Sequence, residues 1–180
     1  MKAKPATIIV PKEYFKPAEG RALVCGSKIY PTKDFDRRSL YADPIGMDMQ
    51  EGPGVDRVGD LGDAKLIKVG EFAHIDCVSV LEHCRNPWNV AFNLMRGLKA
   101  GGTVLISAPY VWRFHGYPSD YFRYTKEGIK ALFPDIQWTF LQYLSEGEWF
   151  KNSPRIRQDH PLFYRSEVVG FGRKEAQATV

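Results

Sequence analysis

The chain has 180 residues with a hydrophobic fraction of 44%, which is enough for one domain with a sizeable core and excludes a disordered chain. Its net charge of +4 is too small to indicate nucleic-acid binding by itself. No apolar run approaches the roughly 18 residues of a membrane span, and we expect no secretory leader. Cys25, Cys77 and Cys84 form no CxxC pair, so we expect reduced thiols in a cytoplasmic protein.

The N-terminal third of the chain predicts three strands with little helix between them. Segment 1–20 contains one short apolar run, residues 7–10, which we expect to pack in extended form on the sheet edge or over the site. Residues 22–26 predict the first strand and residues 45–48 the second, and the first helix should be short or missing. Residues 55–61 alternate in polarity and predict a short third strand.

The centre of the chain has the pattern strand, helix, strand. Residues 75–81 and 103–109 are apolar at successive positions, as in parallel strands that are covered on both faces. Asn86, followed by a proline, is a typical helix start. We expect the helix to cover residues 88–99 and to stop at the glycine pair 101–102.

The C-terminal third alternates polar, aromatic segments with regular elements. Residues 110–124 and 145–166 mix aromatic with charged side chains and predict two substrate loops, because the first directly follows a strand end. Thr125 is placed to cap a short helix. Residues 136–144 predict a sixth strand and residues 167–172 a final one.

Two sequence runs resemble a known family. Residues 80–83 read Val-Leu-Glu-His and residues 98–102 read Leu-Lys-Ala-Gly-Gly. Together they resemble the turns that follow the fourth strand and precede the fifth strand in class I S-adenosylmethionine (SAM)-dependent methyltransferases, with Ala100 in place of the usual proline. Residues 109–128 resemble a segment that follows strand five in one subgroup, similar to methyltransferase type 11.

The resemblance implies an α/β fold: a doubly wound, mostly parallel seven-stranded sheet of the Rossmann-like class I methyltransferase type. The alternation of apolar runs with helical stretches favours the same architecture. One domain would cover residues 1–180, with strands six and seven pairing antiparallel. The implied cofactor is S-adenosyl-L-methionine.

The resemblance also assigns residues to the cofactor. Gly26 stands where the family has a glycine-rich turn, although Lys28 replaces a second glycine. Asp48 follows Gly26 by 22 positions, the spacing of a carboxylate that accepts both ribose hydroxyls. Asp60 would lie near the adenine amino group, and the alternative is that it caps a short helix. The residues expected to contact the cofactor are Cys25, Gly26, Ser27, Asp48, Met49, Asp60, Leu61, Ser79 and Val80.

Methyl transfer from SAM needs mainly alignment of acceptor, methyl carbon and sulfur, so no metal is required. An oxygen or nitrogen acceptor would need a base, and His115 is the best candidate. The alternatives are structural: Asp120 would pair with Arg123 inside a loop mini-core, and Glu82 and His83 would hold a turn. The residues expected to contact the acceptor are His83, Tyr110, Asp120, Tyr121 and Arg123.

Three classes of function follow. The first is a SAM-dependent methyltransferase acting on a small molecule or a glycan. The second is a SAM-binding protein of the same fold that has lost catalysis. The third, a nicotinamide-dependent oxidoreductase, is disfavoured because residues 26–31 do not fit GxGxxG. A nucleic-acid acceptor is less favoured, although Arg113, Arg123, Lys151, Arg155 and Arg157 would make a basic rim. The pattern predicts no membrane partner, and it leaves the acceptor and the oligomeric state open.

Overall fold

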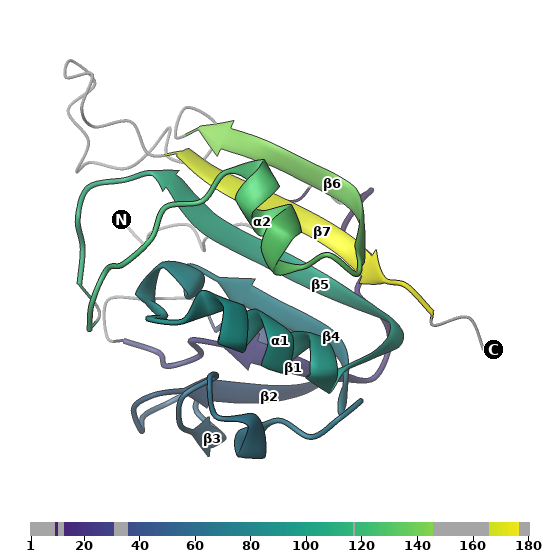
Figure 1. The fold of residues 1–180 in the computed structure, drawn as a ribbon. Coiled ribbons are helices and arrows are strands. Elements are labelled where there is room, and N and C mark those ends of the chain that lie inside the picture. Colours follow the sequence, from purple (N-terminus) through teal and green to yellow (C-terminus); the bar gives the residue numbers. More distant parts are fainter. Residues whose placement is uncertain (1–9, 11–12, 31–35, 117, 146–165, 177–180) are drawn as a thin grey trace, which may run out of the picture.

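The computed structural model describes residues 10, 13–30, 36–116, 118–145 and 166–176. One seven-stranded sheet of order β3-β2-β1-β4-β5-β7-β6 runs through the molecule (Figure 1). β7 is antiparallel to both of its neighbours, and the other pairings are parallel, which confirms the predicted mostly parallel sheet. The strands are β1 (Arg21–Cys25), β2 (Asp43–Asp48), β3 (Arg57–Val58), β4 (Phe72–Val78), β5 (Leu98–Val111), β6 (Ile136–Ser145) and β7 (Ser166–Lys174).

The two α-helices within the described residues begin where the sequence predicts. In α1 (Pro87–Gly97), Asn86 Oδ1 accepts a hydrogen bond from the Asn89 amide at 3.1 Å. In α2 (Lys126–Leu132), Thr125 Oγ1 accepts one from the Gly128 amide at 2.9 Å. Each cap satisfies an amide that has no partner within its helix. None of the described helices is long and apolar enough to cross a membrane.

The predicted end of α1 at residue 99 was wrong. The helix ends at Gly97, and Leu98 already pairs with Phe72 as the first residue of β5. A Cβ at Gly97 would lie 2.3 Å from Ile67 Cγ2, so a close contact with another segment fixes this position. Leu98 is 1% exposed, and its burial favours the extended conformation over a further helical turn. The glycine pair 101–102 therefore lies within β5.

Among the described residues, three short 3₁₀ helices connect the strands: η1 (Arg37–Leu40), η2 (Ala64–Leu66) and η3 (Leu81–His83). η1 is the only helix between β1 and β2 among the described residues, which agrees with a short first helix. Asp63 caps η2 by accepting a hydrogen bond from the Lys65 amide, so Asp60 is not the cap of that helix. β3 is shorter than the predicted 55–61, because Asp60 Oδ1 accepts from the Gly62 amide at 2.7 Å and turns the chain.

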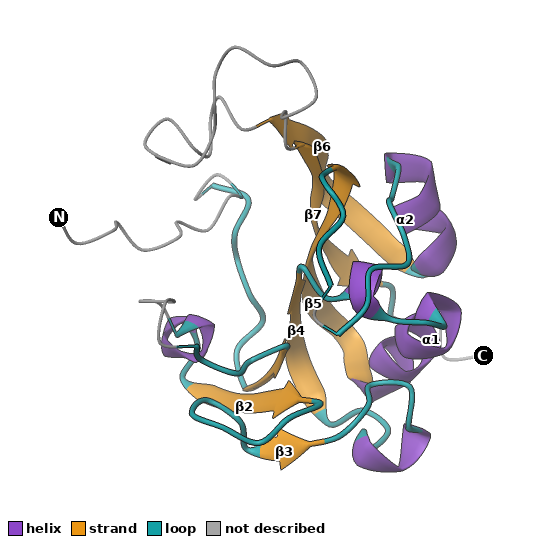
Figure 2. Cartoon of the chain, turned by 90° about the vertical axis from the view of Figure 1, so that its left-hand side faces the viewer, coloured by secondary structure: helices purple, strands orange, loops and turns teal. Residues whose placement is uncertain are grey.

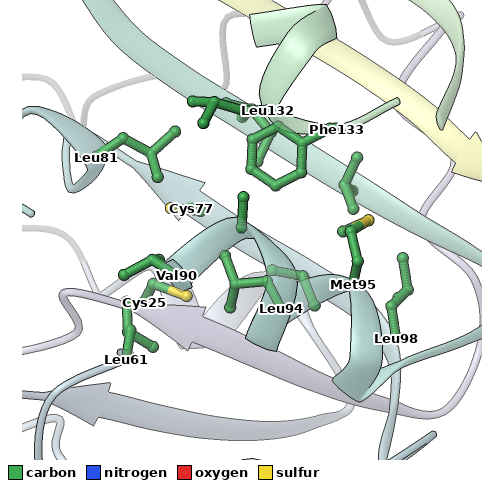
Figure 3. Packing of buried hydrophobic residues seen from close by; sticks show 14 of the residues in the cluster. Cys25, Leu61, Cys77, Leu81, Val90, Leu94, Met95, Leu98, Leu132 and Phe133 are labelled. Atoms are coloured by element: carbon green, nitrogen blue, oxygen red, sulfur yellow. The ribbon is translucent and has the colours of Figure 1, made fainter. Parts of the chain in front are cut away.

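Both α-helices pack on the same face of the sheet (Figure 2). There, Val90 and Leu94 of α1 lie over Cys25 of β1 and Cys77 of β4, within one apolar cluster that also includes Phe133 (Figure 3). All of these side chains are at most 2% exposed. Burial of large apolar side chains contributes roughly 1.5–3 kcal/mol each, so this cluster is the main source of stability. The three cysteines are free thiols, as predicted.

The described part of the N-terminal segment packs on the opposite face of the sheet. Val10 packs with Leu105, Val169 and Phe171, and the Phe15 ring lies 5.5 Å from the Phe171 ring. Val10 and Phe15 therefore lie on the face of the sheet over β5 and β7. The prediction had placed the apolar run 7–10 on the sheet edge or over the site, and residues 7–9 of that run lie outside the described residues.

A buried chain of hydrogen bonds lies on this same face, where it joins the sheet to η1. Thr103 Oγ1 lies 2.8 Å from His74 Nδ1, and His74 Nε2 lies 3.2 Å from the Tyr41 hydroxyl. Tyr41 donates to Asp76 at 3.0 Å, and Asp76 pairs with Arg37 Nε at 3.2 Å. The Tyr41 hydroxyl donates its proton to Asp76, so its oxygen can only accept from His74. A neutral His74 therefore carries its proton on Nε2 and donates it to the Tyr41 oxygen. Polar side chains here replace the apolar contacts that a packed helix would supply.

This arrangement predicts that the fold loses stability in mild acid. Burial lowers the pKa of His74 to about 3, while an unfolded histidine titrates near 6.5. The unfolded chain therefore binds more protons between these values, and the His74 contribution is lost as pH falls from 6.5. From pH 6.5 to 5.0 it should remove about 2 kcal/mol of unfolding free energy.

Urea unfolding of the wild type and of His74→Gln at pH 7.0 and 5.0 checks this. Glutamine keeps one donor and one acceptor but does not titrate. Burial raises the pKa of Asp76, so protonation of that carboxyl in acid favours the folded state, whereas protonation of His74 favours the unfolded state. Asp76 is present in both proteins, so the difference between them isolates His74. Identical pH dependences would contradict the prediction.

Candidate functional site at the carboxyl edge of the sheet

The site lies where the winding of the sheet reverses. The chain adds β2 and β3 on one side of β1, then β4 and β5 on the other. The register sets Cys25, at the end of β1, beside Met47 of β2 and Cys77 of β4. In open parallel sheets, ligands bind beyond the carboxyl ends of the strands at such a reversal. The predicted cofactor-contacting residues of these three strands therefore gather at one edge.

The turns after β1 and β4 press against each other at this edge. Gly26 has φ +61°, and a Cβ added there would lie 2.7 Å from Cγ2 of Val80. Ser79 has φ 54°, a left-handed conformation that a residue with a side chain rarely adopts. Its amide donates to the Ser107 carbonyl of β5 at 2.9 Å, which helps to hold this conformation. Two residues in the left-handed conformation, Gly26 and Ser79, therefore lie on facing turns at this edge.

The end of β2 is joined to the β1 turn through Asp48. One carboxylate oxygen accepts from the Lys28 amide and the other from the Gln50 amide, each at 3.1 Å. The Lys28 side chain turns away and donates to Gln50 Oε1 at 2.8 Å. A carboxylate offers about four acceptor positions, so Asp48, which is partly exposed, keeps acceptor capacity for a ligand. This geometry explains how a lysine stands where the family has a second glycine.

The remaining predicted cofactor residues differ in accessibility. Met49 is 56% exposed, and Asp60 is also exposed at the turn after β3. The side chains of Leu61 and Cys25 lie in the helix-side core, at 7% and 0% exposure. Ser27 is 8% exposed. The exposed members can reach a ligand with their side chains, whereas Cys25 and Leu61 offer only backbone atoms.

Arg37 of η1 is a residue at this edge that the sequence did not reveal. It donates to the Cys25 carbonyl at 2.6 Å and to the Val78 carbonyl at 3.3 Å, the last residues of β1 and β4. With its Asp76 ion pair, the guanidinium fixes both strand ends. Segment 30–44 has no helical period, so nothing in the sequence identifies which of its basic residues turns toward the sheet.

The loop after β5 is held by an internal ion pair. The Asp120 side chain is 1% exposed and accepts from Arg123 Nη2 at 2.7 Å and from the His115 amide at 2.8 Å. These hydrogen bonds, chiefly those from Arg123, hold the pKa of Asp120 far below its usual range. Arg123 also donates to the carbonyls of Trp112 and Phe122. The structural alternative for Asp120 and Arg123 is therefore what the structure shows.

The same loop is attached to η3. His83 Nδ1 lies 2.6 Å from the Ser119 carbonyl, and the Tyr121 amide donates to the Glu82 carbonyl at 2.7 Å. The Tyr124 hydroxyl donates to the Leu81 carbonyl at 2.9 Å. His83 therefore holds the loop rather than its own turn. These bonds set the loop beside the end of β4, as the prediction of a substrate loop requires.

The predicted acceptor residues divide into two groups. His83, Asp120 and Arg123 lie together around His115, whose ring is 5.0 Å from the His83 ring. His115 is 22% exposed, and burial lowers its pKa below the usual value, so the ring is neutral near pH 7.

Tyr110 and Tyr121 make the second group. Tyr110 packs instead against Tyr143 of β6, with ring centroids 4.7 Å apart, and Tyr121 is 48% exposed. Residues 146–165 of the second predicted loop, with Lys151, Arg155 and Arg157, lie outside the described residues.

Comparison with known proteins gives a consistent answer at the level of fold. No family model and no curated protein matches the chain. A putative methyltransferase structure from Bacillus halodurans superposes with a TM-score of 0.65 at 13% identity, over 91% of this chain and 96% of that one. A SAM-dependent methyltransferase from Archaeoglobus fulgidus gives 0.61 at 14% identity, over 90% and 89%.

A third structure carries ligands. The 1,6-didemethyltoxoflavin-N1-methyltransferase of Burkholderia thailandensis, with bound 1,6-didemethyltoxoflavin and S-adenosylhomocysteine, gives a TM-score of 0.59 at 14% identity, over 89% of this chain and 72% of that one. The chain has the class I methyltransferase fold. The predicted doubly wound, Rossmann-like fold class is confirmed, including the antiparallel pairing of β6 with β7. Within the described part of this methyltransferase fold, both α-helices lie on one face.

Proposed function

We propose that the protein is a SAM-dependent methyltransferase that acts on a small-molecule or glycan acceptor. The observation that carries this proposal is the edge formed by β1, β2 and β4. There the left-handed residues Gly26 and Ser79 bring backbone to the surface beside the Asp48 carboxylate. Backbone approach and a ribose-binding carboxylate are what a nucleoside-containing donor needs.

Each part of the edge has a role in this proposal. Asp48 accepts the ribose hydroxyls, while Gly26 and Val80 border the donor. Bound SAM supplies its own leaving group, a sulfonium, so the protein contributes alignment of the reacting atoms. His115 holds its proton on Nδ1, which lies 3.1 Å from the Arg113 carbonyl, so Nε2 is free to take the acceptor proton. With SAM bound, transfer of its methyl group from sulfur to the acceptor atom would leave S-adenosylhomocysteine, and His115 would hold the acceptor proton.

Calorimetric titration with SAM tests the proposal. We expect one binding site on the wild type, and a loss of affinity of about 10- to 150-fold in Asp48→Asn, because a hydrogen bond to a charged group contributes about 1.5–3 kcal/mol. Asp43→Asn is the matched control. Asp43 lies at the opposite end of β2 and pairs with Arg21 in the exposed ion pair there, so its loss should leave SAM affinity unchanged.

Two results would count against this reading in different ways. Absence of SAM binding by the folded wild type would refute the proposed function. Equal SAM affinity of Asp48→Asn and Asp43→Asn would refute only the ribose assignment.

A SAM-binding protein without turnover is the second candidate. It is favoured by one feature: Asp120 and Arg123, which were predicted to contact the acceptor, bond each other instead. Formation of S-adenosylhomocysteine in the presence of candidate small molecules and glycans separates the two. Binding of SAM with no product across such a panel would favour the second candidate.

A further inference from the structure

Three side chains beside the loop after β5 converge on one point. Glu82 Oε1 lies 3.8 Å from Nε2 of His83 and 3.9 Å from Nε2 of His115. One ligand-type atom from each residue lies within 4.8 Å of those of the other two. Glu82 is 1% exposed, while His83 and His115 are 15% and 22% exposed. The carboxylate is therefore buried, and the imidazoles border solvent.

The hydrogen bonds on the far side of each ring fix which nitrogen faces the carboxylate without a proton. His83 Nδ1 lies 2.6 Å from the Ser119 carbonyl and His115 Nδ1 lies 3.1 Å from the Arg113 carbonyl. A carbonyl only accepts, so Nδ1 carries the proton in both neutral rings. Both Nε2 atoms consequently carry a lone pair, and both lie within 4 Å of Glu82 Oε1.

Two imidazole nitrogens and one carboxylate oxygen that lie within 4.8 Å of one another make a set of donor atoms that a metal cation can bind. We infer that Glu82, His83 and His115 form a binding site for a divalent first-row transition-metal ion, with Zn²⁺ as the representative. Two imidazole nitrogens and one carboxylate suit such ions, whereas Mg²⁺ and Ca²⁺ favour oxygen ligands alone. Three protein ligands also leave a coordination position for water or for a ligand atom.

The surroundings match those of metal-binding histidines. Such histidines usually donate their second ring N–H to a carbonyl or a carboxylate, which orients the ring. His83 has the Ser119 carbonyl in that position, and His115 has the Arg113 carbonyl, with Asp120 Oδ2 3.3 Å from the same nitrogen. At metal–nitrogen distances of about 2.0–2.1 Å, neighbouring ligand atoms would be roughly 3.4 Å apart. The observed 3.8 and 3.9 Å need only small side-chain rotations to reach this spacing.

This inference does not rest on methyl transfer, and it changes the picture drawn from sequence, which included no metal. It also constrains His115. A metal ion and a transferable proton exclude each other at Nε2, so His115 acts as a base only in metal-free protein. The sequence gives only weak indications of the site, an adjacent Glu-His pair and a later histidine, because the 31 residues between His83 and His115 must fold before the rings meet.

The test is titration of the metal-stripped full chain with ZnCl₂ alone, followed by calorimetry, and with CoCl₂, followed by absorption. We expect one equivalent of Zn²⁺ per chain. Glu82→Gln and His115→Ala should each weaken binding by at least about 100-fold, beyond the loss typical of an outer-shell partner. The Co²⁺ complex of the wild type should show d–d bands without a thiolate charge-transfer band.

Cys84→Ser is the matched control, because Cys84 follows His83 directly and zinc has a high affinity for thiolates. It should bind Zn²⁺ as the wild type does. Circular dichroism establishes that each variant is folded, and the Co²⁺ spectrum of the wild type needs no variant. The inference is overturned by no binding up to about 0.1 mM Zn²⁺, by full affinity in His115→Ala, or by a thiolate band in the Co²⁺ spectrum.

Discussion

Replacement of Gly26 by alanine is expected to lower SAM affinity by more than about tenfold and the unfolding free energy by about 2 kcal/mol. Gly26 has φ +61°, where an L-residue is strained. The new Cβ would also lie 2.7 Å from Val80 Cγ2, so the turn after β4 must shift. Both turns border the proposed donor site, and the shift reaches the ligand as well as the fold. Thermal melting and SAM titration of one preparation measure both effects.

Gly70→Ala separates strain from contact. Gly70 has φ +59°, almost the same value, but nothing lies within 4 Å of a Cβ built there. Its replacement should cost about 1 kcal/mol from strain alone and leave SAM affinity unchanged. Val80→Ala removes the atom that the new Cβ would meet. In the Val80→Ala background, Gly26→Ala should therefore lower the unfolding free energy only as much as Gly70→Ala does in the wild type. A cost in the double variant equal to the sum of the single ones would show that Val80 is not the obstacle.

Local chemistry explains why much of the fold was predictable. Asn86 and Thr125 were identified as helix caps because each has a side-chain oxygen that reaches an amide three residues on. The strands were located because covered parallel strands are apolar on successive residues. The end of α1 was missed, since the contact of Gly97 with Ile67 depends on a segment 30 residues earlier.

The packing on the sheet face opposite the two α-helices was not predicted, again because it depends on contacts between distant segments. The face that the helices cover was predictable, because the buried residues of α1 repeat at helical spacing. The other face depends on a chain of polar partners from three separate segments: Thr103 of β5, His74 and Asp76 of β4, and Arg37 and Tyr41 at η1. No periodicity marks them, and a buried Asp76 within β4 reads in sequence as one polar residue in an apolar run.

The candidate site was predictable only to the level of strand ends. Parallel strands place their carboxyl ends at one edge, so Gly26, Asp48 and Ser79 were brought together by topology alone. The loop after β5 was harder to interpret, because its sequence allowed Asp120 and Arg123 either to contact the acceptor or to pair with each other. The structure shows the pairing of Asp120 with Arg123, and it adds a contact of His115 with η3 that spacing along the chain does not specify.

Replacement of Arg123 by methionine is expected to lower the unfolding free energy by about 3 kcal/mol near pH 7. Methionine keeps an apolar stem but leaves the buried Asp120 carboxylate without its cation. Because Arg123 depresses the pKa of Asp120, this contribution is present above the unfolded value of about 3.9 and is lost as pH falls below it. The gap between wild type and variant, from urea unfolding, should therefore narrow below pH 4.

Arg113→Met is the matched control from the same loop. The Arg113 side chain is exposed and lies 5.7 Å from the centre of the Trp112 ring, so its loss should change stability by no more than about 0.5 kcal/mol. In Arg123→Met the His115 amide, which donates to Asp120, should also exchange its hydrogen faster. SAM affinity should stay within about twofold in both variants, since the loop contacts η3 rather than the β1 and β2 turns. Equal stability of the two variants would leave the ion pair without a structural role, and loss of SAM affinity in Arg123→Met alone would extend the donor site to this loop.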